Sequence, residues 1–417
     1  PEQQRRRALT QAELDKNIAR SRAWLLVTDP PAHVDAGYVP QLGDVVVYFV
    51  QGHQEQLMEY PEAQCQRAQQ PWEELALGAA EKCEVVDIKY QIPASNEPAG
   101  NSVYCLLLLK RLSESLALPK AGRKFAKGQP VKARWMGAGR AAGHRFPGLV
   151  EDCNEDGTYV VQFDDGDREE REPEDMMVAQ TFVVAYRHAT DLAEFVLPLY
   201  RYERFERNVY GPGDRFKMFY EDSPEPYTGT VLGMRPFHPK DFPDSPWQCL
   251  EVRWDIGGGS GADPDECSQV SPWEIMPLSE EPAPPALTSR LSEADRSRIL
   301  SVLRDTVLSA EVAAPFIAPP AAAELAHVPL PLCLRTIIAR LEAFFYHSRD
   351  QVRHDLGVIC GNPALAARPD ERLVRHARAL EPVFDAVCLD GDVAAALERG
   401  QATLAQYPAG QRGSRRG

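Results

Sequence analysis

The 417-residue sequence lacks the motifs of the common enzyme and metal-binding classes. The glycine-rich stretch Gly137–Gly143 is not followed by the Lys-Ser/Thr pair of a phosphate-binding loop. The nine histidines show no H-E-x-x-H spacing, and no G-x-S-x-G nucleophile elbow occurs. The stretch Asp152–Gly157 begins like an EF-hand loop, but the twelfth position, which needs a bidentate glutamate, is Phe163. We therefore expect a protein that is not an enzyme and that uses no metal or cofactor.

Cysteine pairs and long apolar runs are also missing. The nine cysteines form no CxxC pair and their number is odd, so neither a zinc knuckle nor a disulfide framework is predicted. Reduced thiols of an intracellular protein are expected instead. The longest apolar run, CLLLL, is far shorter than the ~20 residues of a membrane-spanning helix, so no membrane association is expected. The sequence begins PEQQRRR, without an initiator methionine, which predicts a fragment of a longer protein.

Basic charge is scarce relative to acidic charge. The sequence has 46 basic and 61 acidic residues, a formal net charge of −15. Twelve of the acids and two arginines lie between Glu151 and Asp175. Such a block repels nucleic-acid phosphate and attracts a basic partner, so strong direct nucleic-acid binding is not expected. A merely solvated charged surface is the alternative.

What the sequence does contain is a β-rich region followed by a helical one. From Tyr38 to Leu278, short runs of Val, Ile, Phe and Tyr are broken by Gly, Pro, Asn and Asp. After the proline-rich stretch Ser279–Ser289, apolar residues recur at helical spacing, and Ser292 is placed to cap the first helix. The predicted fold class is multidomain: small antiparallel β-barrels followed by an all-α four-helix bundle.

The β region contains an internal repeat. Gly43–Val50, Gly128–Trp135 and Gly213–Tyr220 each combine a glycine turn, alternating apolar residues and an aromatic at or beside the end. The second copy continues with FPGLV and GTYVVQFDDGD, the third with YTGTV and CLEVRWDIGGG. Three bent barrels are the simplest interpretation, the first being the weakest copy. Superposing the second and third copies pairs Trp135 with Tyr220, Phe146 with Tyr227, Phe163 with Trp254, and Asp164 with Asp255.

These paired positions predict aromatic cages at the barrel mouths. Side chains alternate along a strand, so the aromatic that ends it and the acid that follows are expected to meet rings from the neighbouring hairpin. Each ring face attracts a methylated ammonium by ~0.5–2 kcal/mol. The rings could instead fill small cores; cage rings would be partly exposed and core rings buried. Trp247 and Trp273 are assigned to packing. The primary cage is predicted as Tyr220, Tyr227, Trp254 and Asp255, and a possible second cage as Trp135, Phe146, Phe163 and Asp164 or Asp165.

Three stretches carry a resemblance to a known family. Tyr38–Leu57, Phe242–Asp255 and Ser271–Leu278 resemble the bromodomain-and-WD-repeat family, and the resemblance extends over about 38–115 and 180–387. It implies a cryptic Tudor of two interleaved barrels beside a bromodomain, which together bind the histone H3 tail methylated at lysine 4. It also implies a nuclear chromatin protein that engages the nucleosome. Full-length members carry WD repeats and are possible ubiquitin-ligase adaptors.

The sequence departs from that family in two places. An additional Tudor-like unit is inserted in the cryptic Tudor, and the bromodomain has Ala367 where the family has its acetyl-lysine asparagine. A loop tyrosine is also missing, while Asn362 fits a structural asparagine, so acetyl-lysine binding is not expected. The predicted domains are an N-terminal extension (1–37), the cryptic Tudor (38–127 and 180–278), the inserted Tudor (128–179), a linker (279–289), a degenerate bromodomain (290–390), and a C-terminal helix and tail (391–417).

The sequence therefore predicts a chromatin reader of methylated histone H3. Two other functions stay open. The barrels can hold partner proteins as a scaffold or adaptor, with rings that serve only as cores. Alternatively, the Tudor units can bind partners that carry methyl-arginine.

Overall fold

A computed structural model shows a β-rich region followed by helices, as the sequence predicts; the barrels and the bundle stay predictions. By its contacts the chain divides into a β unit (Asp44–Lys89 and Leu106–Glu280) and a helical unit (Pro1–Gly43, Tyr90–Cys105 and Glu281–Gly417). The structure describes residues 21–28, 38–59, 70–75, 77–92, 103–112, 125, 127, 130–134, 145–154, 156–163, 166–172, 176–178, 181–187, 194–219, 225–255, 267–280, 291–320, 328–365 and 369–406.

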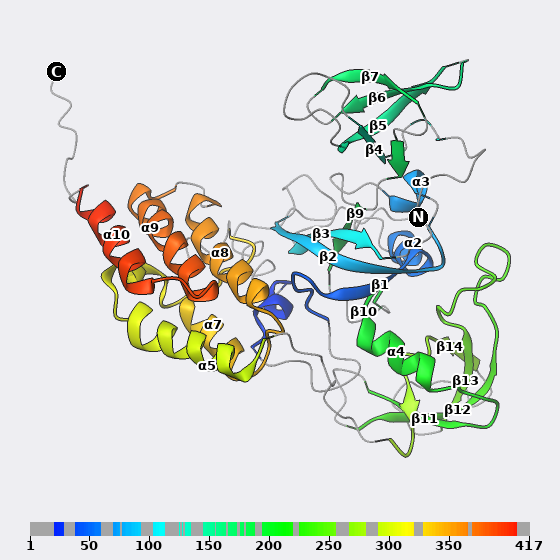
Figure 1. Ribbon diagram of the computed structural model, residues 1–417. Helices are drawn as coiled ribbons and strands as arrows, with labels where there is room; N and C mark the ends of the chain where they lie inside the picture. Colours follow the sequence, from blue (N-terminus) through cyan, green and yellow to red (C-terminus); the bar gives the residue numbers. More distant parts are fainter. Residues whose placement is uncertain are drawn as a thin grey trace, which may run out of the picture. The chain divides into compact units, whose positions relative to one another are not determined.

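Three five-stranded sheets share one topology (Figure 1). Numbered in chain order within each sheet, the strands lie in the spatial order 5-1-2-3-4, and every pair with a defined register is antiparallel. The first sheet consists of β1 (Val45–Phe49), β2 (Ala80–Gln91), β3 (Tyr104–Arg111), β9 (Thr181–Tyr186) and β10 (Val196–Pro198). The second consists of β4 (Pro130–Arg134), β5 (Arg145–Cys153), β6 (Tyr159–Phe163), β7 (Arg168–Arg171) and β8 (Met176–Val178). The third consists of β11 (Arg215–Met218), β12 (Tyr227–Met234), β13 (Leu250–Trp254), β14 (Cys267–Val270) and β15 (Met276–Pro277).

The second and third sheets also agree in register, which confirms the repeat found in the sequence. Phe163 pairs with Gly148 just as Trp254 pairs with Gly229. A register shift follows two residues later in both β5 and β12. The second sheet lies in the chain between the third and fourth strands of the first sheet, so it is an insertion in the first sheet's sequence.

The β unit also contains helices that the sequence pattern did not predict. They are α2 (Val50–Glu59), α3 (Pro71–Glu74) and α4 (Leu199–Arg207). Helix α2, with the sequence VQGHQEQLME, has no apolar stripe, which is why a periodicity search misses it. The helix packs closely against Trp247 at Gly52, where an added Cβ would lie 2.3 Å from the Trp247 ring. Tertiary packing, not intrinsic pattern, therefore determines this helix.

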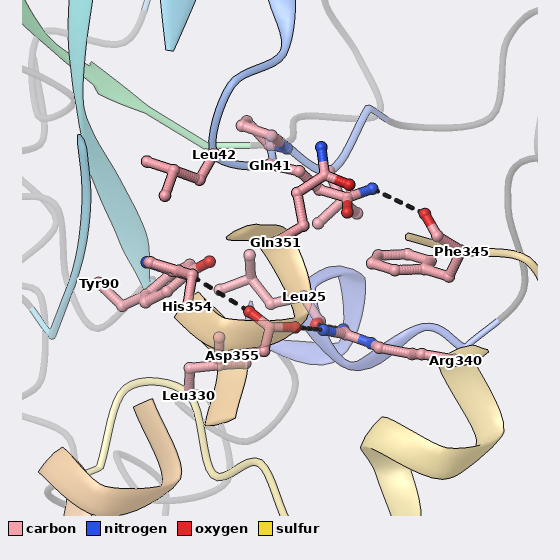
Figure 2. Close-up of a pocket in the computed structure, with 12 residues that line it drawn as sticks. Leu25, Gln41, Leu42, Tyr90, Leu330, Arg340, Phe345, Gln351, His354 and Asp355 are labelled. Atoms are coloured by element: carbon pink, nitrogen blue, oxygen red, sulfur yellow. Dashed lines mark hydrogen bonds and ion pairs between the residues drawn. The ribbon is translucent and has the colours of Figure 1, made fainter. Parts of the chain in front are cut away.

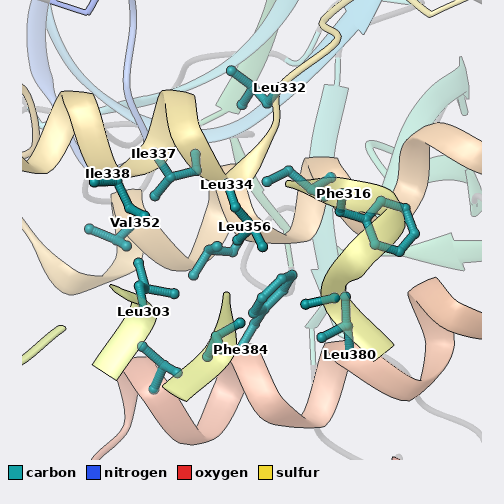
Figure 3. Close-up of a cluster of buried hydrophobic side chains, with 14 of the residues drawn as sticks. Leu303, Phe316, Leu332, Leu334, Ile337, Ile338, Val352, Leu356, Leu380 and Phe384 are labelled. Atoms are coloured by element: carbon teal, nitrogen blue, oxygen red, sulfur yellow. The ribbon is translucent and has the colours of Figure 1, made fainter. Parts of the chain in front are cut away.

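The helical unit has an apolar core built from several helices. Its elements are η1 (Ala23–Leu26), α5 (Glu293–Ser301), the π-helical η5 (Val302–Val307), η6 (Glu311–Phe316), α7 (Leu334–Glu342), α8 (Arg349–Leu365), α9 (Glu371–Cys388) and α10 (Val393–Ala405). Figure 3 shows side chains from η5, α8 and α9 converging, among them Leu303, Leu356 and Phe384, each at most 2% exposed. The predicted cap is confirmed, because the Ser292 hydroxyl accepts a hydrogen bond from the Asp295 amide at 3.1 Å. Among the described residues, no helix is both long and apolar enough to cross a membrane.

Candidate functional site

Strand register brings two residues of the predicted primary cage onto one face of the third sheet. Phe216, Gly229 and Trp254 lie side by side on β11, β12 and β13. Tyr227 is two residues from Gly229 on β12, so its side chain lies on the same face. The Trp254 ring meets the buried Phe216 ring edge to face, with centroids 5.1 Å apart, and Tyr227 and Trp254 are both half-buried. The face therefore offers a supported but accessible indole and phenol.

Gly229, on the middle strand β12, leaves the space in which the Phe216 and Trp254 rings meet. A Cβ at Gly229 would lie 2.6 Å from both the Phe216 ring and the backbone oxygen of Arg253. The matching Gly148 in the second sheet is equally confined, with the backbone oxygen of Gln162 at 2.7 Å from its ideal Cβ. Both repeated units thus need glycine at this position for packing, independent of any ligand.

Asp255 is not brought together with the aromatic rings. Its carboxylate forms a double hydrogen-bonded ion pair with Arg215, with 2.7 Å between Nη1 and Oδ1, and it accepts a further hydrogen bond from the Thr228 hydroxyl. Arg215 and Thr228 each neighbour a residue of the aromatic face, so their side chains lie on the opposite face. The hydrogen bonds from Arg215 and Thr228 lower the pKa of Asp255 to about 2. This acid is therefore ionised, paired and turned away from Trp254.

The other residues of the two predicted cages are either outside the described residues or differ in their exposure. Tyr220, Trp135, Asp164 and Asp165 lie outside the described residues. Phe146, the counterpart of Tyr227, is 38% exposed, whereas Phe163, the counterpart of Trp254, is 4% exposed. Phe163 belongs to the apolar core of the second sheet, together with Val131, Ala133, Val161 and others.

The Phe163 ring is also covered by a cation of the chain itself. The guanidinium carbon of Arg171 lies 5.6 Å from the ring centroid, and the Arg171 side chain is buried. Arg171 forms an ion pair with Glu169 and donates to the backbone oxygen of Glu170 at 2.6 Å. The sequence analysis counted Arg171 only as part of the local charge and assigned no role to Arg215, so it missed the pairing of both residues. Strand alternation could have indicated that Arg215 faces away from the rings, because Arg215 directly precedes the inward-facing Phe216.

Trp247 and Trp273 pack in a separate aromatic core, which confirms their assignment. They are 2% and 4% exposed. Trp273 stacks on Phe49 with centroids 4.5 Å apart and planes 20° apart. Trp247 donates its indole N–H to Glu55 of α2 at 2.8 Å. This core joins β1 and α2 to two loops that lie about 200 residues later in the chain.

The helical unit contains a buried ion pair beside a small cavity (Figure 2). Arg340 Nη1 lies 2.6 Å from Asp355 Oδ2, and the Tyr346 hydroxyl donates to the same oxygen at 2.8 Å. Burial opposes ionisation of Asp355, but His354 and Arg340 outweigh it and the pKa of Asp355 lies below its usual value. Arg340 also donates to the backbone oxygen of Val27 at 3.0 Å. The pair therefore fastens the segment after η1 to helices α7 and α8, which is a structural role.

The bromodomain-like positions are only partly described. Ala367 lies outside the described residues. Asn362 is 6% exposed and donates its side-chain N–H to the backbone oxygen of Leu330 at 2.9 Å, which confirms its structural role. Every cysteine in the described ranges is a free thiol. Those ranges contain no cluster of three or more His, Cys, Asp or Glu side chains that could hold a metal ion.

Two family models match successive parts of the chain. The BRWD/PHIP ancillary domain-like domain matches residues 36–125, and the auxin response factor ancillary domain matches residues 195–279. The first match supports the resemblance to BRWD/PHIP-like proteins. Phe49 and Gly52 belong to the first matched segment, whereas Trp247 and Trp273 belong to the second. The two matched segments therefore share one aromatic core, with the second sheet encoded between them.

The chain is also similar to curated plant proteins over part of its length. It is 40% identical over 105 residues to auxin response factor 2A of Solanum lycopersicum, covering 24% of this chain and 12% of that protein. It is 40% identical over 104 residues to auxin response factor 23 of Oryza sativa subsp. indica, with the same shares. It is 41% identical over 102 residues to auxin response factor 4 of Arabidopsis thaliana, covering 23% of this chain and 12% of that protein. The chain thus matches only a small part of each relative.

Proposed function

We propose that the chain is a non-enzymatic nuclear reader that binds the histone H3 tail, methylated at lysine 4, on the nucleosome. A BRWD/PHIP-like ancillary domain is compatible with a chromatin-related protein. The observation that carries the proposal is the aromatic face of the third sheet, where the half-buried Tyr227 and Trp254 lie on the same face and the Trp254 ring meets the buried Phe216 ring. Ring faces of this kind attract a methylated ammonium, which is cationic and poor at hydrogen bonding.

The proposed site uses aromatic rings more than charge. Asp255 is paired with Arg215, so its carboxylate contributes little attraction at the ring face. Tyr220, two positions after the end of β11 in the sequence, would complete the face, as the sequence repeat predicts. Long-range attraction for the basic H3 tail comes instead from the net charge of −15.

Calorimetric titration of the chain with H3 tail peptides tests this proposal. We expect trimethylation of lysine 4 to strengthen binding, and Tyr227→Ala to weaken the methylated complex about 5- to 30-fold, equal to ~1–2 kcal/mol of cation–π attraction. Phe146→Ala, the matched change in the second sheet, should leave affinity unchanged. Equal affinity for unmodified and trimethylated peptides, with both variants like the wild type, would contradict the proposal.

A second function is favoured for the inserted unit by the burial of Phe163. A ring that is 4% exposed and covered by Arg171 is a core residue of its own sheet. We therefore propose that the second sheet acts as a scaffold for a partner protein and not as a second methyl-lysine reader. The remaining alternative for the inserted unit is that it binds methyl-arginine, and a methyl-arginine peptide in the same titrations tests this. Binding that is abolished by Phe146→Ala would show that the inserted unit recognises methyl-arginine.

For the helical unit we propose a role other than acetyl-lysine recognition. The Asn362 nitrogen already donates to the Leu330 backbone oxygen, so this amide serves the fold. Ala367 has no amide to hold an acetyl carbonyl. A role for the full-length protein as a ubiquitin-ligase adaptor rests on the family resemblance alone.

A further inference from the structure

The helical unit has a cavity apart from the aromatic face. It lies between η6, the start of α9 and one side of α8, and its open space, including the solvent at its mouth, is about 610 Å³. Among the described residues the wall is mostly apolar, with Phe316, Val328, Leu332, Ile359 and Leu373 among its side chains. The polar residues of this described wall are Asn362 and Asp370.

Asn362 and Asp370, the polar residues of the described wall, both have side-chain oxygens that can accept hydrogen bonds. The Asn362 nitrogen is engaged with the Leu330 backbone oxygen, and within the described part of the chain its side-chain oxygen accepts no hydrogen bond. This amide is 6% exposed and lines the cavity. Asp370 lines the cavity and caps α9 through one oxygen, which accepts from the Arg372 amide at 2.8 Å; the carboxylate has a second oxygen that can accept. Within the described ranges, no basic residue lines the cavity.

We propose that this cavity binds the unmodified side chain of a lysine from a basic peptide. A lysine ammonium has three donors and no acceptor, so it matches the Asn362 oxygen and the Asp370 carboxylate. Its four-carbon stem covers apolar surface such as Phe316, Val328 and Ile359 while the charge stays near the mouth. Asp370 is exposed, so the ammonium keeps contact with water and avoids the cost of full burial.

The same geometry disfavours an acetylated lysine. Acetylation removes the charge that Asp370 attracts and adds a carbonyl oxygen that requires a donor. On the described wall, the Asn362 side-chain nitrogen is already bound to the Leu330 backbone oxygen, and Asp370 presents a carboxylate. The Asn362 oxygen and the Asp370 carboxylate cannot donate to the acetyl carbonyl, so that carbonyl would stay without a hydrogen bond, which is unfavourable in an apolar cavity.

Methyl-detected NMR of the full chain tests the proposal. The probes are three capped tripeptides, Ala-Lys-Ala, Ala-Lys(acetyl)-Ala and Ala-norleucine-Ala, and the signals followed are the methyl groups of Val328, Leu332, Ile359 and Leu373. Ala-Lys-Ala should shift these signals in a saturable way. The acetylated and norleucine peptides should bind about two- to five-fold more weakly, because they lack the charge that an exposed carboxylate attracts.

The decisive variant is Asp370→Asn, which keeps the helix cap because asparagine caps as well as aspartate. It should weaken Ala-Lys-Ala about two- to five-fold, in the range of an exposed ion pair. Asp392→Asn is the matched control, since Asp392 caps α10 through the Ala395 amide at 2.9 Å and does not line the cavity. No saturable shift with Ala-Lys-Ala, tighter binding of the acetylated peptide, or equal loss in both variants would overturn the proposal. Since neither the readout nor the variants involve Tyr227 or Trp254, these results are independent of the methyl-lysine titrations.

Discussion

At the scale of single residues, the surroundings of an acid decide what it can do. Asp255 follows Trp254 in the sequence, but its carboxylate is bound by Arg215, 40 residues earlier, on the other face of the sheet. The aromatic half of the site could be predicted because it repeats in the sequence. The pairing of Asp255 with Arg215 could not be predicted, because a contact between distant residues depends on the strand register and leaves no local pattern in the sequence.

Glu274, in the sequence Ser-Pro-Trp-Glu, yields a prediction about pH. Burial raises the pKa of Glu274 to about 7, although it accepts a hydrogen bond from the Ser271 amide at 2.7 Å. A raised pKa means that the folded state favours the protonated form. The stability this provides is complete below the unfolded pKa near 4.5 and is lost as the pH rises through about 7.

We therefore expect Glu274→Gln, which stays uncharged, to gain about 2 kcal/mol over the wild type between pH 5 and pH 8. Urea unfolding followed by tryptophan fluorescence at both pH values measures the difference. Glu293→Gln is the control, because hydrogen bonding to Arg296 lowers the pKa of Glu293 and leaves it ionised throughout that range. Parallel pH profiles for wild type and Glu274→Gln would show that Glu274 does not titrate there.

At the scale of elements, the repeated strands were predictable and the small helices were not. Alternation with period two is local, and it identified the copies that became β4–β6 and β11–β13. Helix α2 has no such pattern because most of its buried residues are glutamine, histidine and glycine, with Gly52 packed against Trp247. Its existence depends on a residue almost 200 positions away, which a local reading of VQGHQEQLME does not contain.

Substitution of Gly52 tests this dependence. Gly52→Ala should destabilise the β unit by about 1–3 kcal/mol, the usual cost of overpacking, because Trp247 is 2% exposed and anchored to Glu55. Gly233→Ala in β12 is the matched control, since nothing lies within 4 Å of its ideal Cβ. Thermal unfolding of both variants decides: equal midpoints would show that Trp247 moves aside freely.

At the scale of the whole molecule, the chain has a β unit and a helical unit with separate chemistry. The change from β pattern to helical pattern across Ser279–Ser289 was evident from the sequence, because both periods are local. In the β unit, one sheet combines accessible rings with a neutralised acid, and its repeat has the equivalent ring buried under Arg171. The two sheets thus share one topology, while among the described residues only the third sheet has both of the equivalent rings accessible.

The most direct test of the central claim is the indole N–H signal of Trp254 in ¹⁵N-labelled protein. It is assigned with Trp254→Phe and followed during titration with an H3 tail peptide trimethylated at lysine 4. We expect this signal to shift with the methylated peptide and to shift much less with the unmodified one. The indoles of Trp247 and Trp273, which are 2% and 4% exposed, should stay in place and serve as internal controls. A Trp254 signal that does not move at saturating methylated peptide, or that moves equally with the unmodified peptide, would contradict the assignment of this face as a methyl-lysine site.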